Sequence, residues 1–446
     1  MANPKFVTTL TLPTALIEQC KEAYCTANTS EAIRNALTDF LLLPYTEQKI
    51  DSFAVHQLLP DIEDRQTLSK VTLRLDDNLR RILLELSAEQ DSLSKTAELM
   101  ISHTLNAEPQ EHSTSLKTDL LYILGNKRDS KMQDAIRTIK DTAQNVRWET
   151  CIETCVGVLG IYSNFRFANT EIMNDNDWNK INLYKAIQEN PRRLIILARA
   201  LKVDTATFNA QKSLLDNTKH SAKVNYEAAS AYLYLNKNSF RHEGTVLNNK
   251  ATQSSYHKRL AAIAPLHQRM NQTASSSQAT KFQNIDLLKL IEKYRRQKHV
   301  LFIVDPPYLD VDYYNKKSGD AVSDDSTSKD SVPDDFTSDS AESDTAKSDD
   351  IIFGEAEHKK LARLLQLVKQ NNGNNFIYFC RITAAKSDQK KPNAEEWDRH
   401  MHGRIDDLYH GHGFYCMDVA LDNATTERII TSFPFKGATL YGKGVR

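Results

Sequence analysis

The sequence predicts an α/β protein with an open, mostly parallel sheet, preceded by a small α+β region. The apolar run Val300 to Val304 has the length and the β-branched and aromatic content of a strand buried on both faces. From residue 118 onward, strand-like and helical segments follow one another. Near the N-terminus a strand-helix-helix pattern occurs twice. We expect a domain at 1–106, a polar linker at 107–117 and a larger domain at 118–446.

Length and charge set the first limits on function. A chain of 446 residues is long enough for two or three domains with a sizeable core. Residues 320–350 contain eleven acids and two lysines, a local net charge of −9, which leaves +8 for the rest of a chain whose net charge is −1. That basic remainder is compatible with a polyanionic partner.

Cysteine and histidine usage argues against disulfide-rich and zinc-binding proteins. Six cysteines without a Cys-x-x-Cys motif fit a reducing cytosol. The pairs His400/His402 and His410/His412 could bind zinc, but polar Gly-containing loops surround them, so we expect no metal. The N-terminus lacks a basic segment followed by an apolar core, and no run approaches the ~18 apolar residues of a membrane span. We therefore expect a soluble, cytoplasmic protein without membrane contact.

The N-terminal repeat has a consistent register. Leu10 and Leu73 stand at matching places in two period-2 strands, 63 residues apart, and Ser30 and Ser94 precede the second helices, 64 residues apart. Both serines are expected to be helix N-caps. Alternation directs Leu73 and Leu75 inward and leaves polar side chains outside.

These two segments resemble the ribbon-helix-helix family of DNA-binding domains. The resemblance implies that the two strands pair antiparallel and that their ribbon enters the major groove. Both copies in one chain would form an internal pseudo-dimer, so a monomer is expected, or a homodimer through this domain. The alternative is an ordinary packing domain. The outward side chains expected to read double-stranded DNA are Thr9, Thr11, Lys70, Thr72 and Arg74.

A glycine-containing turn follows the first strand of the larger domain. The strand at 148–152 runs into Glu153-Thr-Cys-Val-Gly157, where glycine lets the backbone approach a ligand closely. A second strand ends at Asp175, 18 residues beyond Gly157. That spacing is typical of a carboxylate that binds the ribose hydroxyls of a cofactor.

The strand at 300–304 ends on Asp305-Pro-Pro-Tyr308. The prolines cannot continue a strand, so an acid, a rigid carbonyl and an aromatic ring stand together at its carboxyl end, where open α/β sheets bind ligands. A carboxylate and a carbonyl that accept the two hydrogens of an exocyclic amine can localise its lone pair, while a ring stacks on the base. The alternative is a proline-ended strand without a function.

Together these motifs resemble the Dam-type, alpha-group or D12 class, DNA adenine-N6 methyltransferases over about residues 118–446. The resemblance implies a Rossmann-like, seven-stranded methyltransferase sheet and S-adenosylmethionine as cofactor. In the family turn Pro and Phe usually occupy the positions of Thr154 and Cys155, and a second glycine that of Leu159. The implied cofactor-binding residues are Tyr122, Gly125, Asn126, Lys127, Glu153, Thr154, Cys155, Gly157, Asp175 and Asp286. The implied catalytic residues are Asp305, Pro306, Pro307 and Tyr308.

Two insertions are expected in this domain. Residues 203–280 occupy the slot of the family's target-recognition region, and their basic and aromatic side chains suit DNA contact, with Asn236, Lys237 and Arg241 as candidates. A helical insertion without that role is the alternative. Residues 316–350 are rich in Ser and Asp and are expected to be disordered.

The predicted function is methyl transfer from S-adenosylmethionine to N6 of adenine in DNA, at a flipped base. Two alternatives remain open: a methyltransferase of structured RNA, and a DNA-binding regulator whose methyltransferase half is inactive.

Overall fold

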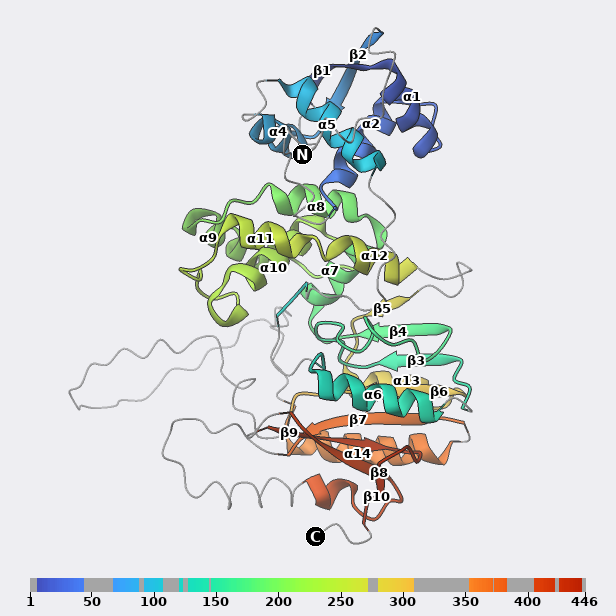
Figure 1. Ribbon diagram of the computed structural model, residues 1–446. Helices are drawn as coiled ribbons and strands as arrows, with labels where there is room; N and C mark the ends of the chain where they lie inside the picture. The colour runs from blue at the N-terminus through green and yellow to red at the C-terminus, as the bar shows by residue number, and fades with distance from the viewer. Residues whose placement is uncertain are drawn as a thin grey trace, which may run out of the picture.

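The computed structural model describes residues 6–43, 67–87, 92–106, 120–122, 127–143, 146–271, 280–308, 353–371, 373–382, 405–421 and 425–442. The predicted linker at 107–117, the acidic insertion at 316–350, Gly125 and Asn126 lie outside these residues. Three parts follow one another along the molecule: an N-terminal unit, a helical region, and a sheet with its flanking helices (Figure 1).

The N-terminal unit consists of two strand-helix-helix segments. The first comprises β1 (Phe6–Pro13), α1 (Thr14–Ala23) and α2 (Thr29–Phe40), and the second β2 (Leu68–Leu75), α4 (Asp77–Ser87) and α5 (Leu93–Asn106). β1 and β2 pair antiparallel, with Thr9 opposite Thr72. The leucines at 10, 73 and 75 are fully buried, as the alternation predicts. The two strands therefore form a ribbon with one face on the core and one face outward.

The expected serine N-caps are wrong. The side chain of Asn28 caps α2, and the hydroxyl of Ser92 accepts a bond from the first turn of α5. Ser30 instead donates to the Thr72 carbonyl of β2 (3.2 Å), and Ser94 accepts a backbone N–H of β1 (2.9 Å). Each serine ties the second helix of one segment to the strand of the other, which links the two halves of the unit.

The helical region begins earlier than the predicted insertion. It comprises α7 (Trp178–Glu189), α8 (Pro191–Arg199), α9 (Thr205–Asp216), α10 (Tyr226–Asn238), the short η2 (Phe240–His242), α11 (Gln253–Leu260) and α12 (Ile263–Asn271). α10 is central, because nearly all its side chains are buried and it packs on α7, α8 and α9. Its apolar core is continuous with the core of the N-terminal unit. None of the described helices is long and apolar enough to cross a membrane.

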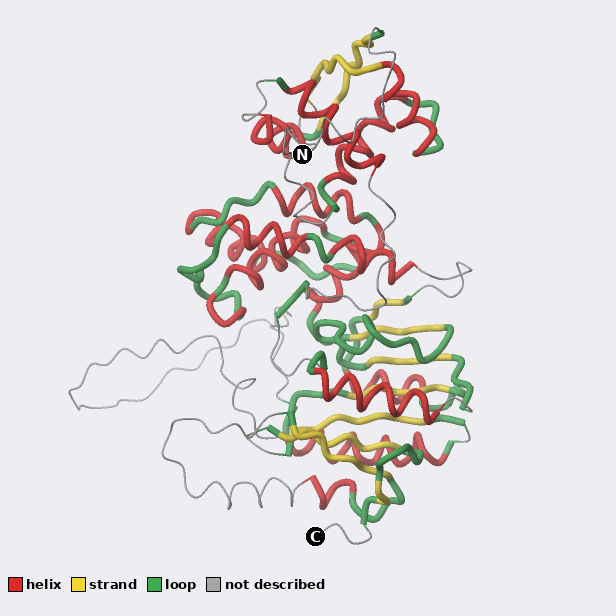
Figure 2. Tube along the Cα trace, viewed as in Figure 1, coloured by secondary structure: helices red, strands yellow, loops and turns green. Residues whose placement is uncertain are grey.

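The sheet, whose strands are yellow in Figure 2, has eight strands among the described residues, in the order β10-β8-β9-β7-β6-β3-β4-β5. Their bounds are β3 (Thr150–Glu153), β4 (Thr170–Asn174), β5 (Lys281–Gln283), β6 (Val300–Val304), β7 (Asn375–Arg381), β8 (Tyr415–Ala420), β9 (Thr426–Thr431) and β10 (Thr439–Leu440). β3 to β7 are parallel, and β9 runs antiparallel between β7 and β8. The predicted number of seven is exceeded because β10 adds a two-residue edge strand.

Helices cover both faces of the sheet. On one side α6 (Ser130–Thr142) packs against Leu301 and Ile303 of β6. On the other side α13 (Leu287–Tyr294) and α14 (Glu355–Gln370) pack against Phe302 and Val304. All five residues of β6 are buried, which confirms the expected two-sided burial.

The order of the strands reverses at β3, which has β4 on one side and β6 on the other. Such a reversal opens a crevice for ligands at the carboxyl ends of the strands.

Candidate active site

The acid of the proline corner lies against a buried lysine. Asp305 follows β6 directly and keeps 21% of its side chain exposed, whereas the side chain of Lys127 is only 3% exposed. The Lys127 Nζ lies 2.8 Å from Asp305 Oδ2 and donates to the Tyr308 hydroxyl at 2.7 Å. An acid, an ammonium and a phenol therefore meet at the carboxyl end of the central strand.

Glu427 completes this cluster from β9. Its Oε1 accepts the Tyr308 hydroxyl proton at 2.9 Å, and its Oε2 lies 3.4 Å from the Lys127 Nζ. Glu427 is not among the residues expected from the sequence. The sequence gives one indication of this role: Glu427 is an acid at the start of an apolar strand, and a buried acid requires a charged partner.

The charges in this cluster shift one another's pKa values. Burial raises the pKa of Asp305 to about 6, with Lys127 opposing the rise and Glu427 adding to it. Burial lowers the pKa of Lys127, but Asp305, Tyr308 and Glu427 outweigh it and hold that pKa well above its ordinary value. Burial, and then the charge of Asp305, raises the pKa of Glu153 at the end of β3. Lys127 thus stays charged at neutral pH, and the pKa of Asp305 lies closer to neutrality than that of an ordinary carboxyl group.

The proline carbonyls differ in their surroundings. The Pro307 carbonyl lies 3.2 Å from His358 Nε2 of α14; since a carbonyl only accepts, Nε2 carries the proton in this contact. Within the part of the chain that is described, no donor bonds the Pro306 carbonyl. The Pro307 carbonyl is therefore held by His358. The Pro306 carbonyl, next to Asp305, has no such bond among the described residues.

The turn after β3 is fixed against β6. The backbone N–H and the hydroxyl of Thr154 both donate to the Ile303 carbonyl, at 2.9 and 3.2 Å. Thr154 is fully buried, so its side chain positions the turn. Gly157 has φ +49° and nothing within 4 Å of where a Cβ would lie, so the space on that side of its backbone is open to a ligand.

Leu159 and Gly160 shape the second half of the turn. Leu159 is fully buried and adopts φ +60°, a conformation that L-residues rarely adopt. A Cβ on Gly160 would lie 3.2 Å from the Lys127 backbone nitrogen. The glycine that the family turn would have at 159 is therefore replaced by a strained leucine, and Gly160 permits close approach to Lys127.

Asp175 stands beside the turn, at the end of β4. Its Oδ2 accepts the Gly157 N–H at 3.1 Å, and its Oδ1 accepts from the Asp177 N–H and from Lys180 Nζ, each at 3.0 Å. A carboxylate has about four acceptor sites, so one remains on Oδ2 for a hydroxyl. Asp286 caps α13 just after β5, at the same edge of the sheet.

A comparison with protein families identifies the family of this chain. Residues 125–355 match the D12 class N6 adenine-specific DNA methyltransferase family. The chain belongs to this family. The match includes the glycine turn, the helical region and the proline corner, and it implies methylation of DNA that depends on S-adenosylmethionine. No curated protein matches the chain.

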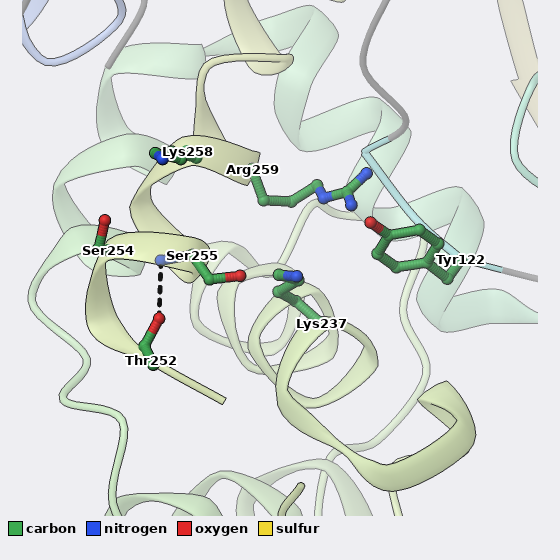
Figure 3. A pocket seen from close by; sticks show the side chains of 7 residues that line it. All are labelled: Tyr122, Lys237, Thr252, Ser254, Ser255, Lys258 and Arg259. Atoms are coloured by element: carbon green, nitrogen blue, oxygen red, sulfur yellow. Dashed lines mark hydrogen bonds between the residues drawn. The ribbon is translucent and has the colours of Figure 1, made fainter. Parts of the chain in front are cut away.

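Two expected site residues, Tyr122 and Asn236, contact each other and the helical region. The contacts of Tyr122 are with the helical region: its ring stacks on His242 with centroids 4.1 Å apart, and the Arg259 guanidinium lies 3.9 Å from its centroid (Figure 3). Asn236, expected to read DNA, is 7% exposed, and its amide bonds both the N–H and the carbonyl of Tyr122. That amide is used internally, and the DNA contact expected of Asn236 stays a prediction.

The other expected DNA-binding residues lie near or at the surface of the methyltransferase. Arg241 is exposed beside the Phe240 ring, and Lys237 is half-buried. On the outer face of the ribbon Thr11 is half-buried, and four residues are exposed: Thr9, Lys70, Thr72 and Arg74. The family match begins beyond this unit, so its ribbon-helix-helix assignment stays a prediction.

Metal-binding residues do not cluster in the described residues of the methyltransferase: no group of three or more His, Cys, Asp or Glu there could hold a metal ion. His410 and His412 are exposed, and the other predicted pair lies outside the described residues. Cys151 is buried and Cys155 half-buried beside the turn.

Proposed function

We propose that this chain transfers the methyl group of S-adenosylmethionine to the exocyclic N6 of adenine in DNA, with Asp305 at the reacting nitrogen. The observation that carries the proposal is the bond from the Thr154 N–H to the Ile303 carbonyl, 2.9 Å. It fixes the glycine turn and the proline corner side by side at the reversal of strand order. A cofactor at the turn and a base at the corner would then face each other.

The residues present fit this cofactor. Gly157 leaves open space where a side chain would lie, Asp175 keeps an acceptor site for a ribose hydroxyl, and Asp286 supplies a further carboxylate at the same edge. When bound, S-adenosylmethionine supplies an electrophilic methyl group. Thr154 would act by holding the turn against β6, and Lys180 by orienting Asp175.

Asp305 and the Pro306 carbonyl would accept the two hydrogens of the adenine amine. This localises the nitrogen lone pair and aims it, which supplies much of the rate through orientation. The nitrogen becomes cationic during the reaction, so the carboxylate also stabilises the charge as it develops. With a pKa of about 6, Asp305 is suited to take up the proton that the nitrogen then loses.

Lys127, Tyr308 and Glu427 would position this acid. Because Lys127 already donates to Asp305 Oδ2, the amine is expected to bond Oδ1, the other oxygen of that carboxylate. The Tyr308 hydroxyl is held by Lys127 and Glu427, which fixes the ring at the corner. Stacking of this ring on the flipped base is part of the proposal.

The N-terminal unit would be a second DNA-binding surface. Its ribbon pairs two strands of one chain, as an internal pseudo-dimer requires, and presents hydroxyl, ammonium and guanidinium groups outward. Such a surface suits base edges and phosphates in the major groove. We propose that it holds the enzyme, as a monomer, at preferred sites.

The Asp305→Asn variant tests the catalytic role. We expect methylation of DNA to fall by about 10²-fold or more, since the amide cannot take the proton or carry the charge. Binding of S-adenosylmethionine, measured by calorimetry, and binding of DNA should be kept. Asp134→Asn, an exposed acid of α6 paired with Arg137, is the control and should keep full activity.

The same measurements separate the alternatives. An inactive regulator would give no heat with S-adenosylmethionine while still shifting DNA on a gel. An RNA methyltransferase would modify structured RNA and leave DNA unmodified. Full DNA methylation by Asp305→Asn would contradict the mechanism itself.

A further inference from the structure

The helical region contains a basic pocket outside the proposed catalytic site. It has a volume of about 380 Å³ and is lined by Tyr122 and by residues of α10 and α11 (Figure 3). Three of its lining residues are cationic: Lys237, Lys258 and Arg259. No acidic residue is among the described residues that line it. The pocket is therefore suited to an anion.

Hydroxyl groups supply the neutral donors of this pocket. Thr252, Ser254 and Ser255 line it where α11 begins, and the Thr252 hydroxyl accepts the Ser255 N–H at 3.1 Å as the N-cap. In Figure 3 the Ser255 hydroxyl points toward the side chain of Lys237. Burial lowers the pKa of Lys237, so an anion beside it would restore the preference for the charged form.

Tyr122 forms the wall of the pocket and is held firmly. Asn236 bonds both backbone groups of Tyr122, at 2.9 and 3.0 Å. The Tyr122 ring stacks on the His242 ring. The Arg259 guanidinium lies 3.9 Å from the centroid of the Tyr122 ring, and the Lys237 Nζ lies 5.3 Å from it. Two cations are thus fixed around one ring, and Arg259 is 7% exposed. Such a pre-formed site loses little entropy when it binds a ligand.

The chain also limits how far this pocket can lie from the catalytic corner. Tyr122 and Lys127 are five residues apart, so their Cα atoms are separated by at most about 18 Å. Along one DNA strand, with a rise of about 3.4 Å per nucleotide, this corresponds to a few base-pair steps. A phosphate close to the target base falls within that range.

We propose that the Tyr122 pocket binds one backbone phosphate of the substrate DNA, a few nucleotides from the adenine at Asp305. This rests on the proposed function, because the phosphate belongs to the DNA that is methylated. Lys237 and Arg259 contact the phosphate oxygens, and the hydroxyls of α11 complete the donor set. Such a contact sets the register of the duplex and carries no sequence information of its own.

The test compares the full-length wild type with Lys237→Ala and Lys237→Arg. Lys212→Ala, an exposed lysine of α9 that does not line the pocket, is the matched control. DNA affinity is measured by fluorescence anisotropy over a range of salt concentrations. One lost phosphate contact should reduce the slope of log affinity against log salt by about 0.9 in Lys237→Ala, and Lys237→Arg and Lys212→Ala should keep the wild-type slope.

Ethylation interference then locates the phosphate. On a duplex whose methylated adenine has been mapped with the wild type, ethylation of one phosphate within a few nucleotides of that adenine should block binding. The same position should lose its effect in Lys237→Ala. Binding of S-adenosylmethionine by each variant, measured by calorimetry, shows that the fold is kept.

Each failure has its own signature. If the wild type neither binds S-adenosylmethionine nor methylates DNA, the proposed function has failed. If the wild type methylates DNA but Lys237→Ala keeps the full salt slope and interference pattern, the phosphate pocket is wrong and the proposed function stands. Binding of inorganic phosphate that depends on Lys237, with an unchanged DNA slope, would identify a free-anion site and overturn the proposal.

Discussion

Asp305 combines two properties at the scale of single residues: it is the proposed acceptor of the substrate amine, and burial raises its pKa to about 6. Only the carboxylate can accept both the hydrogen bond and the proton. We therefore expect the rate of methyl transfer to fall about tenfold per pH unit as the pH drops below 6, and to be level between 7 and 8. Single-turnover rates at saturating cofactor and DNA measure this. A level rate down to pH 5 would exclude Asp305 as the titrating group.

In the proposed mechanism Glu427 would act on the same reaction through Asp305. Its negative charge adds to the rise in the pKa of Asp305 and its Oε1 holds the Tyr308 hydroxyl. In Glu427→Gln this charge is gone, so the acid limb of the rate profile should move to lower pH. The pH profile distinguishes this positioning role from simple destabilisation, which would lower the rate equally at all pH values. Asp418→Asn, which removes a partner of Arg428 on the adjoining strand β8, should leave the limb in place.

At the scale of elements, the burial of Leu159 stabilises the glycine turn, whereas the backbone strain at this residue destabilises it. Leu159 at φ +60° costs about 1–2 kcal/mol of conformational energy, and its full burial contributes about 2–5 kcal/mol. Burial is the larger effect, so Leu159→Gly and Leu159→Ala should both lower the free energy of unfolding. Because alanine keeps the strain, Leu159→Ala should be the less stable of the two by about 1 kcal/mol, the reverse of the usual order. Urea unfolding measures both variants.

The ribbon of β1 and β2 carries the second prediction at this scale. Lys70 and Arg74 are exposed on its outer face, so replacing both with alanine should leave the fold unchanged. DNA affinity should fall, and the salt slope should decrease by about 1 for each residue that contacts a phosphate. Lys21→Ala on α1, which removes an exposed pair with Glu18, is the control. Unchanged DNA affinity in the double variant would argue for a packing role of the N-terminal unit.

Local patterns predicted much of this element structure. The period-2 strands placed Leu73 and Leu75 in the core, and the apolar run at 300–304 is a strand with those bounds. The three-residue β5 (Lys281–Gln283) was missed because it is too short to give a period. The caps were misassigned because Ser30 and Ser94 bond a strand of the other segment, a contact between residues far apart in sequence.

At the scale of the whole molecule, the site depends on contacts that no local pattern reveals. Lys127 meets Asp305 and Glu427 across separations of 178 and 300 residues, so only the sheet order brings the three together. The proline motif predicted where Asp305 lies, because this acid directly follows its own strand, β6. Tyr122 was assigned to the cofactor from its neighbours in sequence, whereas its contacts come from α10 and α11.

The connection between the N-terminal unit and the helical region gives the last prediction. Arg192 of α8 donates to both carboxylate oxygens of Asp39 on α2, at 2.6 and 2.8 Å, and the Tyr24 hydroxyl adds a bond of 2.8 Å. A bidentate, charge-assisted pair over a continuous apolar core should hold the two parts as one body. Asp39→Asn removes the charge and one acceptor, and should weaken this contact by about 1–2 kcal/mol.

Hydrogen exchange in the native state measures this weakening. In Asp39→Asn the amides of α2 and of the ribbon should exchange faster by about tenfold, and those of β3 and β6 should keep their rates. Glu227→Gln is the matched control, because Glu227 pairs with the neighbouring Arg193 with both side chains about half exposed, where such pairs contribute about 0–1 kcal/mol. Equal exchange in both variants would mean that the apolar core alone joins the N-terminal unit to the helical region. In that case DNA bound at the ribbon would still be held at a fixed distance from the catalytic corner, but not through the Asp39–Arg192 pair.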